Sequence, residues 1–274
     1  MLSKRLILLS MLAATPLLGE TTTLTMDDRV YGIQRTVWIV KSPSTLDTSK
    51  GDYNLVILLP GAWYANDVDA PGAIDALAKA GKIGPTVAAI IDTSDLLPAN
   101  LATRVKWAGF MAGAFMPWLQ AQFGALPKAS RVTIGGASVG GITAAYVAFR
   151  HPELFGNVIA QSGAFWRGNE GSSDPPEWLI AQLRSSPRLP IRFYIEVGAG
   201  ETQIAPNGLV FIEANRHLRD VLREKGYVVQ YVEVPGAKHE PTHWRAALPA
   251  ALTYVAAPAP RPARPAAEPH SRVR

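Results

Sequence analysis

The sequence predicts a single α/β domain in which a mostly parallel sheet is covered by helices on both faces. Short apolar segments rich in β-branched residues recur along the chain, and segments of helical character lie between them. Near-continuous apolar strands that alternate with helices are typical of a parallel sheet buried on both sides. The sequence between residues 25 and 255 shows no internal repeat and no obvious linker. We therefore expect one three-layer domain.

The expected elements follow one another at intervals that suit this arrangement. The predicted strands are RTVWIV, NLVILL, TVAAIID, RVTIGG, NVIAQSG, IRFYIEV and VVQYVEV. The predicted helices cover residues 71–82, 102–123, 140–150 and 208–226, with a final helix that opens near His243. The clearest is 208–226, where Phe211, Leu218 and Leu222 share one face and Gly226 ends the helix.

Composition excludes several classes of protein. The chain has 274 residues, of which 48% are hydrophobic and 18% charged, so it is not a mainly disordered protein. It contains no cysteine, which excludes disulfides, thiolate metal sites and a cysteine nucleophile.

The two ends differ from the central part of the chain. Residues 1–22 combine a basic start with an apolar stretch too short to span a membrane comfortably, which favours a secretory signal over a buried first helix. Cleavage is expected near residues 19–23, which would place the protein in the periplasm or outside the cell. Residues 257–274 form a Pro, Ala and Arg-rich tail expected to be disordered. The ends account for the net charge of +5, so we expect no nucleic-acid partner for the folded domain, residues 23–256.

One serine lies among small residues where a strand is expected to turn into a helix. Residues 136–140 read GASVG, which fits the pattern G-x-S-x-G, with an apolar strand before it and a helical segment after it. This is the setting of a nucleophile elbow, in which the serine adopts a strained conformation and its neighbours must be small. Ser138 is therefore the predicted nucleophile, and the N–H of Val139 is predicted to bind an oxyanion. The alternative is a serine that caps a helix.

A serine nucleophile needs a base, and five histidines are available. His270 lies in the tail, His217 in the middle of a predicted helix, and His151 where the helix after the elbow should end. His239 follows the last predicted strand, which is where an α/β-hydrolase carries its base. His243 opens the final helix and is interpreted as a structural or pocket residue, so we favour His239.

The acid of an α/β-hydrolase lies between the serine and the histidine in the chain. Glu201 follows the strand IRFYIEV, whereas Glu196 lies within it and should point to one face of the sheet. We therefore predict Glu201 as the acid. The alternative is that Glu201 is an exposed loop carboxylate and that Ser138 and His239 act as a dyad. The turn in VILLPGAWY should supply the second oxyanion N–H, from Ala62 or Trp63.

Taken together, these segments resemble the enterochelin (enterobactin) esterases, a branch of the putative-esterase family of α/β-hydrolases. The resemblance covers roughly residues 30–255 and lies in RVTIGGASVGGITAAYVAFRHPELFGNVIAQSGAFW, LLPGAW, FYIEVGAGE and GAKHEPTHWRAAL. The motifs G-x-S-x-G-G, H-P-x-x-F and Q-S-G-x-F-W, and a histidine five residues before Trp-Arg, are fairly specific to that branch. The resemblance implies an α/β-hydrolase fold and hydrolysis of the esters of a catecholate siderophore trilactone.

The chain departs from the branch at several positions. Pro60 stands where members usually have an acidic residue, and Ala237-Lys238 replaces the Gly-Gly before the histidine. Arg104 and the pair Pro117-Trp118 are retained, without the acidic residues that accompany them in the branch. These changes concern the substrate more than the serine chemistry.

Aromatic and basic residues beside the predicted catalytic segments are candidates for substrate binding, with core packing or solvent exposure as the alternative for each. These candidates are Trp63, Tyr64, Arg104, Trp166, Arg167 and Trp244. The tryptophans could stack on aromatic acyl groups and the arginines could meet an anionic iron–catecholate. The expected partner is a small-molecule ester, and the chemistry needs no metal or organic cofactor.

Three functions follow from these observations. The first is siderophore-ester hydrolysis by an exported esterase. The second is a general exported carboxylesterase or acyltransferase that acts on feruloyl, sugar or lipid esters. The third is a catalytically silent binding protein that kept the fold.

Overall fold

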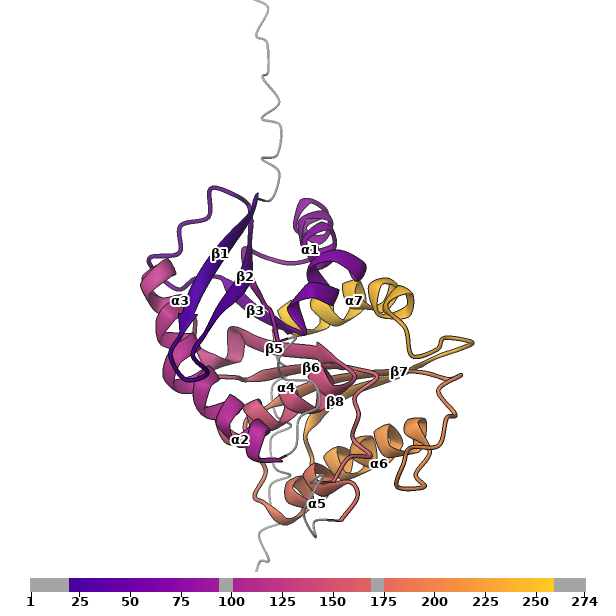
Figure 1. Ribbon diagram of the computed structural model, residues 1–274. Coiled ribbons are helices and arrows are strands. Elements are labelled where there is room, and N and C mark those ends of the chain that lie inside the picture. The colour runs from indigo at the N-terminus through magenta and orange to yellow at the C-terminus, as the bar shows by residue number, and fades with distance from the viewer. Residues whose placement is uncertain (1–19, 94–100, 169–174, 259–274) are drawn as a thin grey trace, which may run out of the picture.

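A twisted eight-stranded sheet forms the centre of the protein in the computed structural model, which describes residues 20–93, 101–168 and 175–258 (Figure 1). The strand order is β1-β2-β4-β3-β5-β6-β7-β8. β1 pairs antiparallel with β2, and β2 antiparallel with β4, whereas all the other neighbours are parallel. The strands are β1 (Glu20–Asp28), β2 (Ile33–Ser42), β3 (Asn54–Leu59), β4 (Thr86–Ile91), β5 (Val132–Ala137), β6 (Asn157–Gln161), β7 (Arg192–Gly198) and β8 (Val228–Val234).

Helices cover both faces of the sheet, as Figure 1 shows. One face carries η1 (Trp63–Asp67), α1 (Ala70–Lys79) and α7 (Pro241–Ala256). The other face carries α2 (Leu101–Phe110), η3 (Met111–Phe115), α3 (Met116–Phe123), α4 (Val139–Arg150), α5 (Trp178–Ser185) and α6 (Phe211–Glu224). A short 3₁₀ turn, η4 (Ala129–Arg131), precedes β5.

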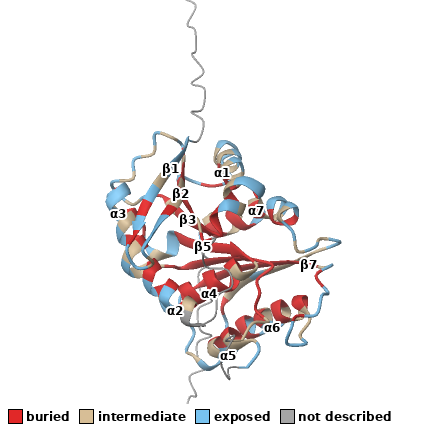
Figure 2. Cartoon of the chain, viewed as in Figure 1, coloured by how far each residue is buried: buried red, intermediate tan, exposed pale blue. Residues whose placement is uncertain are grey.

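The alternation of side chains along the central strands divides the core into two layers. Leu55 and Ile57 of β3 belong to the cluster under α2–α6, whereas Val56 and Leu58 belong to the cluster under α1 and α7. All four are buried, as the red central strands of Figure 2 illustrate. Successive residues of a strand point to opposite faces, so a continuous apolar run is what a sheet covered on both sides requires.

The structure confirms the predicted fold class. Each of the seven predicted strands is present, and the strand order with an antiparallel start is that of an α/β-hydrolase. None of the helices in the described ranges is long and apolar enough to cross a membrane. The predictions for residues 1–19 and 259–274 fall outside the described residues.

Three elements of the structure are not predicted by the sequence patterns: β1, η1 and α5. β1 includes Glu20, Thr21 and Thr22, which lie within the predicted leader, and its first four residues are exposed. The strand is anchored at its other end, where the buried Asp28 accepts a hydrogen bond from the buried Arg35 of β2 at 2.5 Å. Cleavage after Gly19, the first position of the predicted range, would leave β1 whole.

Two glycines bring β3, β5 and α4 into backbone contact beside the serine. A Cβ on Gly136 would lie 2.5 Å from the carbonyl oxygen of Leu59, and a Cβ on Gly140 would lie 2.4 Å from the same oxygen. Any side chain here would push the start of α4 away from the end of β3. The glycines therefore serve both tight packing and the turn that holds Ser138.

We expect Gly140→Ala to lower the free energy of unfolding by about 1–3 kcal/mol, the usual cost of overpacking a dense core. Its matched control is Gly109→Ala, because a Cβ on that glycine of α2 meets no atom within 4 Å. That variant should gain about 0.5–1 kcal/mol from the lost flexibility of glycine. Urea unfolding followed by circular dichroism measures both. Equal shifts in the two variants would contradict the steric argument.

Candidate active site

Ser138 lies at a sharp turn between the end of β5 and the start of α4. Its backbone has φ 55° and ψ −120°, a conformation that non-glycine residues rarely adopt outside functional sites. Although Ser138 occupies the N-cap position of α4, its side chain makes no capping hydrogen bond. The helix-capping alternative therefore does not describe this hydroxyl, which is directed elsewhere.

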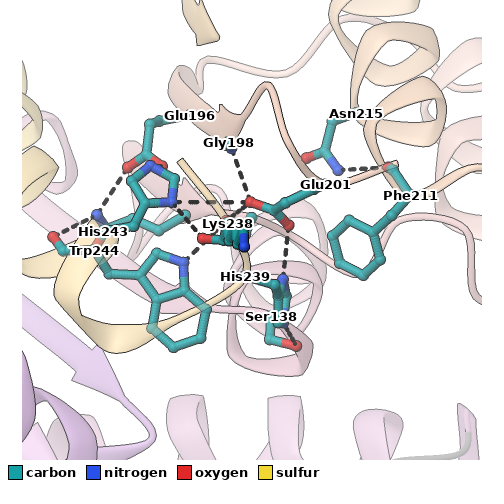
Figure 3. A network of polar contacts seen from close by, with 12 residues as sticks. Ser138, Glu196, Gly198, Glu201, Phe211, Asn215, Lys238, His239, His243 and Trp244 are labelled. Atoms are coloured by element: carbon teal, nitrogen blue, oxygen red, sulfur yellow. Dashed lines mark hydrogen bonds and ion pairs between the residues drawn. The ribbon is translucent and has the colours of Figure 1, made fainter. Parts of the chain in front are cut away.

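The three predicted catalytic side chains form one hydrogen-bonded chain (Figure 3). The Ser138 Oγ lies 2.9 Å from Nε2 of His239, and Nδ1 of the same ring lies 2.7 Å from Oε2 of Glu201. His239 is carried by the loop between β8 and α7, and Glu201 follows β7. Glu201 is fully buried, so the alternative of an exposed loop carboxylate is wrong.

The second oxygen of Glu201 is held by two donors. Oε1 accepts a hydrogen bond from Ser162 Oγ at 2.5 Å and one from the Gly198 N–H at 2.8 Å. Ser162 Oγ in turn accepts a hydrogen bond from Trp244 Nε1 at 2.9 Å. Because both carboxylate oxygens are engaged, the oxygen that faces His239 has a fixed position.

Aromatic rings flank the imidazole of His239. Phe211 and Trp244 meet it edge-on, with ring centroids 4.7 and 5.2 Å away. Trp63 stacks on Trp244 at 5.4 Å, and Trp166 contacts Phe211 at 6.5 Å. The sequence analysis did not single out Phe211 for this position, since it stands in a helical apolar pattern that also predicts core packing.

The two predicted oxyanion donors lie at the starts of helical segments that follow two adjacent strands, β3 and β5. Val139 is the first residue of α4, where a backbone N–H has no acceptor within the helix. Ala62 precedes η1 in the turn after β3, and β3 pairs with β5 with Leu59 opposite Gly136. The assignment of both N–H groups to an oxyanion remains a prediction.

The six candidate substrate-binding residues fall into two groups. Trp63, Trp166 and Arg167 are partly exposed, and the Arg167 guanidinium lies 4.9 Å from the centre of the Trp166 ring. The other three are buried, at 0%, 1% and 1% exposure, as the core-packing alternative expects, and their contact with a substrate stays a prediction: Tyr64, Trp244 and Arg104.

Each buried member of the set has a polar contact within the protein. The Tyr64 hydroxyl donates to Gln161 Oε1 at 2.9 Å, and burial, followed by the charge of Glu196, raises the pKa of this phenol well above 10. Trp244 donates to Ser162, and Arg104 lies 3.5 Å from the Gly168 carbonyl oxygen. Through these contacts the buried side chains hold residues next to the proposed triad or at the edge of the site.

The polar residues that contact or surround Glu201, above all Gln161 and Ser162, are not predicted as site residues from the sequence. Both lie where β6 ends, and Ser162 has a positive φ of 47°. The family motif Q-S-G-x-F-W contains both residues, so the signal was present without a role attached to it. Glu196 and His243, for which the sequence does not predict a catalytic role, are also buried polar residues close to the acid.

The sheet order, the elbow and the hydrogen-bonded Ser–His–Glu chain define an α/β-hydrolase. Its sequence matches the family described as Putative esterase over residues 34–255, most of the chain. The protein belongs to that family.

Sequence comparison finds similar proteins among the siderophore esterases. The chain is 27% identical over 226 residues to the iron(III) enterobactin esterase of Escherichia coli O6:H1, an alignment that covers 78% of this chain and 52% of the relative. The chain thus spans about half the length of that curated relative. Among solved structures, the enterobactin esterase of Shigella flexneri, determined in the presence of enterobactin, has a TM-score of 0.71 at 24% identity, covering 86% of this chain and 58% of that one. A ferulic acid esterase of Anaeromyces mucronatus has a TM-score of 0.68 at 17% identity, covering 87% and 90%.

Proposed function

We propose that this protein is a serine esterase that hydrolyses the ester bonds of a catecholate siderophore trilactone. The observation that carries the enzymatic part is the hydrogen-bonded chain from Ser138 through His239 to the buried Glu201. The choice of substrate is supported by the similarity to iron(III) enterobactin esterases.

In the first half of the proposed reaction, Ser138 Oγ attacks the ester carbonyl carbon while His239 Nε2 takes its proton. Glu201 accepts the Nδ1–H and stabilises the imidazolium that forms. The N–H groups of Val139 and Ala62 bind the negative oxygen of the tetrahedral intermediate. The intermediate collapses when the C–O bond to the alcohol breaks, and the alcohol leaves with the proton from His239.

In the second half, water replaces the alcohol. His239 Nε2 removes a proton from water as the water oxygen attacks the acyl-serine carbonyl carbon. The bond to Ser138 Oγ then breaks and Oγ regains its proton from the imidazolium. The acid is released, and the enzyme returns to its starting state.

Aromatic side chains at the edge of the site support a substrate with aromatic rings. Trp63 and Trp166 are partly exposed and extend the ring contacts around His239 on its two sides. Tryptophan faces stack well on phenolic rings. Arg167, which lies against Trp166, adds a positive charge suited to an anionic iron–catecholate.

A second candidate, a general carboxylesterase or acyltransferase for feruloyl, sugar or lipid esters, is favoured by one observation. The alignment covers 90% of the ferulic acid esterase from A. mucronatus but only about half of the enterobactin esterases. A phenolic acyl group would meet the same tryptophans.

The deciding experiment incubates the purified protein with ferric enterobactin, iron-free enterobactin and a feruloyl ester, and resolves the products by chromatography. We expect linear dihydroxybenzoyl-serine products from enterobactin, because the proposed site would open the lactone. Ser138→Ala serves as the control that identifies enzyme-dependent cleavage. Turnover of the feruloyl ester with intact enterobactin would transfer the proposal to the second candidate. Inactivity toward every ester would leave the binding-protein alternative.

We also propose that the protein is exported. The basic residues Lys4 and Arg5 followed by the apolar stretch to Leu18 support a secretory signal. Fractionation of the producing cells tests this, and recovery of the protein only from the cytosol would contradict it.

A further inference from the structure

A second buried histidine–carboxylate pair lies directly behind the proposed triad (Figure 3). His243 Nε2 lies 2.6 Å from Glu196 Oε1, and the two side chains are 3% and 0% exposed. His243 Nδ1 lies 3.0 Å from the carbonyl oxygen of Lys238 and 3.9 Å from Glu201 Oε1. Lys238 immediately precedes His239, so this pair touches the segment that carries the proposed base and approaches its acid.

The contacts of the pair indicate its charge. Gln161 Nε2 lies 2.9 Å from both the Trp244 carbonyl oxygen and Glu196 Oε2. Because a carbonyl oxygen can only accept, the amide nitrogen must face this side, and Glu196 Oε2 therefore accepts a hydrogen bond. Both nitrogens of His243 also face acceptors, the Lys238 carbonyl and Glu196 Oε1. His243 Nε2 and Glu196 Oε1 lie at ion-pair distance without the alignment of a hydrogen bond, while Nδ1 faces the Lys238 carbonyl as a donor. The imidazolium is the form of His243 that an ionised carboxylate at this distance stabilises.

The surroundings of His243 agree with this assignment. The titratable groups around the pair are Glu196 and Tyr194 of β7, Glu201 after β7, His239 before α7 and Tyr64 of η1. Burial alone would lower the pKa of His243, but the close contact with Glu196 and its charge outweigh burial and raise the pKa above 6.5. Burial and then Glu196 raise the pKa of Tyr194 to about 12 and that of Tyr64 well above 10, so neither phenol ionises near neutral pH.

We propose that His243, as an imidazolium held by Glu196, is a positioning residue for the ester hydrolysis proposed above, on which this inference rests. It anchors the Lys238 carbonyl and thereby fixes the segment that presents His239. It also places a positive charge beside Glu201, so that two buried carboxylates share a cation. His243 touches no substrate, because it is buried behind the triad and acts through its neighbours.

This arrangement gives the reaction a pH dependence of defined sign. A raised pKa means that the imidazolium persists to higher pH than in a free histidine and is lost as pH rises through the folded-state pKa. Deprotonation leaves one ring nitrogen of His243 without a proton opposite an acceptor, either the Lys238 carbonyl or Glu196. We therefore expect kcat to decline at alkaline pH, with KM little changed.

His243→Gln tests the proposal, because the amide has nearly the same reach but no charge. For a p-nitrophenyl ester, kcat should fall about tenfold, the order expected for one lost hydrogen bond to a charged group. KM should stay within about twofold, because the residue acts on the catalytic step rather than on binding. The alkaline decline of the wild type should be absent from this variant. His151→Gln is the matched control, since this histidine pairs with Glu153 at the far end of α4 and should keep the wild-type profile.

Glu196→Gln provides a second, charge-specific readout. Without the carboxylate, the pKa of His243 should fall, and the alkaline decline should move toward lower pH by at least about one unit. A purely structural role would lower activity without moving this midpoint. The midpoint of the alkaline decline in Glu196→Gln therefore tests the positioning role of His243 even if His243→Gln does not fold.

Two results would overturn the inference. One is a pH profile of His243→Gln parallel to that of the wild type, and the other is a midpoint unmoved by Glu196→Gln. Ser138→Ala separates this failure from failure of the proposed function. If Ser138→Ala is active, the proposed esterase mechanism is wrong. If it is inactive while His243→Gln matches the wild type, only the positioning role is wrong.

Discussion

Replacing Ser138 with alanine is expected to lower kcat/KM for p-nitrophenyl esters by about 10⁴-fold or more, the range found when a serine-protease nucleophile is removed. The reason is that Oγ is the atom that forms the acyl-enzyme, and the 2.9 Å contact to His239 has no function without it. Stopped assays with the purified variant measure the loss. The fold should be retained, because the Ser138 side chain makes no capping bond.

A glycine at the same position separates chemistry from backbone strain. Ser138 has φ 55° and ψ −120°, which costs a side-chain-bearing residue about 1–3 kcal/mol. Ser138→Gly should therefore be as inactive as Ser138→Ala but unfold at a higher temperature. Ser185→Ala, on the exposed end of α5, is the control and should change neither property. Substantial activity in either Ser138 variant would overturn the assignment of the nucleophile.

Glu201→Gln is expected to lower kcat/KM by about 10³ to 10⁴-fold while preserving the shape of the side chain. The Gly198 N–H can only donate, so the amide oxygen of glutamine must take the place of Oε1. The amide nitrogen then faces His239 Nδ1, where the wild type has an acceptor. This forces the proton onto Nε2, and His239 in that tautomer cannot accept the proton of Ser138.

The control for this variant lies in the same region of the chain. Glu240 directly follows His239, is exposed, and makes no capping bond at the start of α7, so Glu240→Gln should stay within about twofold of the wild type. Steady-state assays at several pH values compare the two variants. A Glu201→Gln enzyme with near-wild-type kcat would show that Ser138 and His239 work as a dyad.

The sequence was sufficient to predict the central sheet and to single out the three side chains of the proposed triad, because both depend on local patterns in a fixed chain order. Buried parallel strands read as apolar runs, and the elbow reads as small residues around a serine. β1 was not predicted because it is an edge strand with mostly exposed threonines. The contact that anchors it joins Asp28 to Arg35 of the neighbouring strand, and a local pattern does not reveal such a contact. The threonine-rich start of β1 also resembled the end of a leader.

The orientation of individual side chains could not be predicted from their place in the chain. Trp63 and Tyr64 are consecutive, yet one is partly exposed beside the site and the other is fully buried beneath it. Glu196 was correctly placed on one face of a strand, but a strand position does not reveal a partner on α7. Roles that depend on two side chains meeting across the sheet require the three-dimensional structure.

The proposed triad joins residues that are far apart in the chain, because His239 follows Ser138 by 101 positions and Glu201 by 38. Contacts of such separation form late in folding, since the loops between them must first be closed. The histidine reaches Ser138 only when β8 has paired and α7, with His243 and Trp244, has docked on the sheet. Regain of enzymatic activity would then follow the return of secondary structure during refolding, and a chain emerging from synthesis would be inert until its last helix is in place.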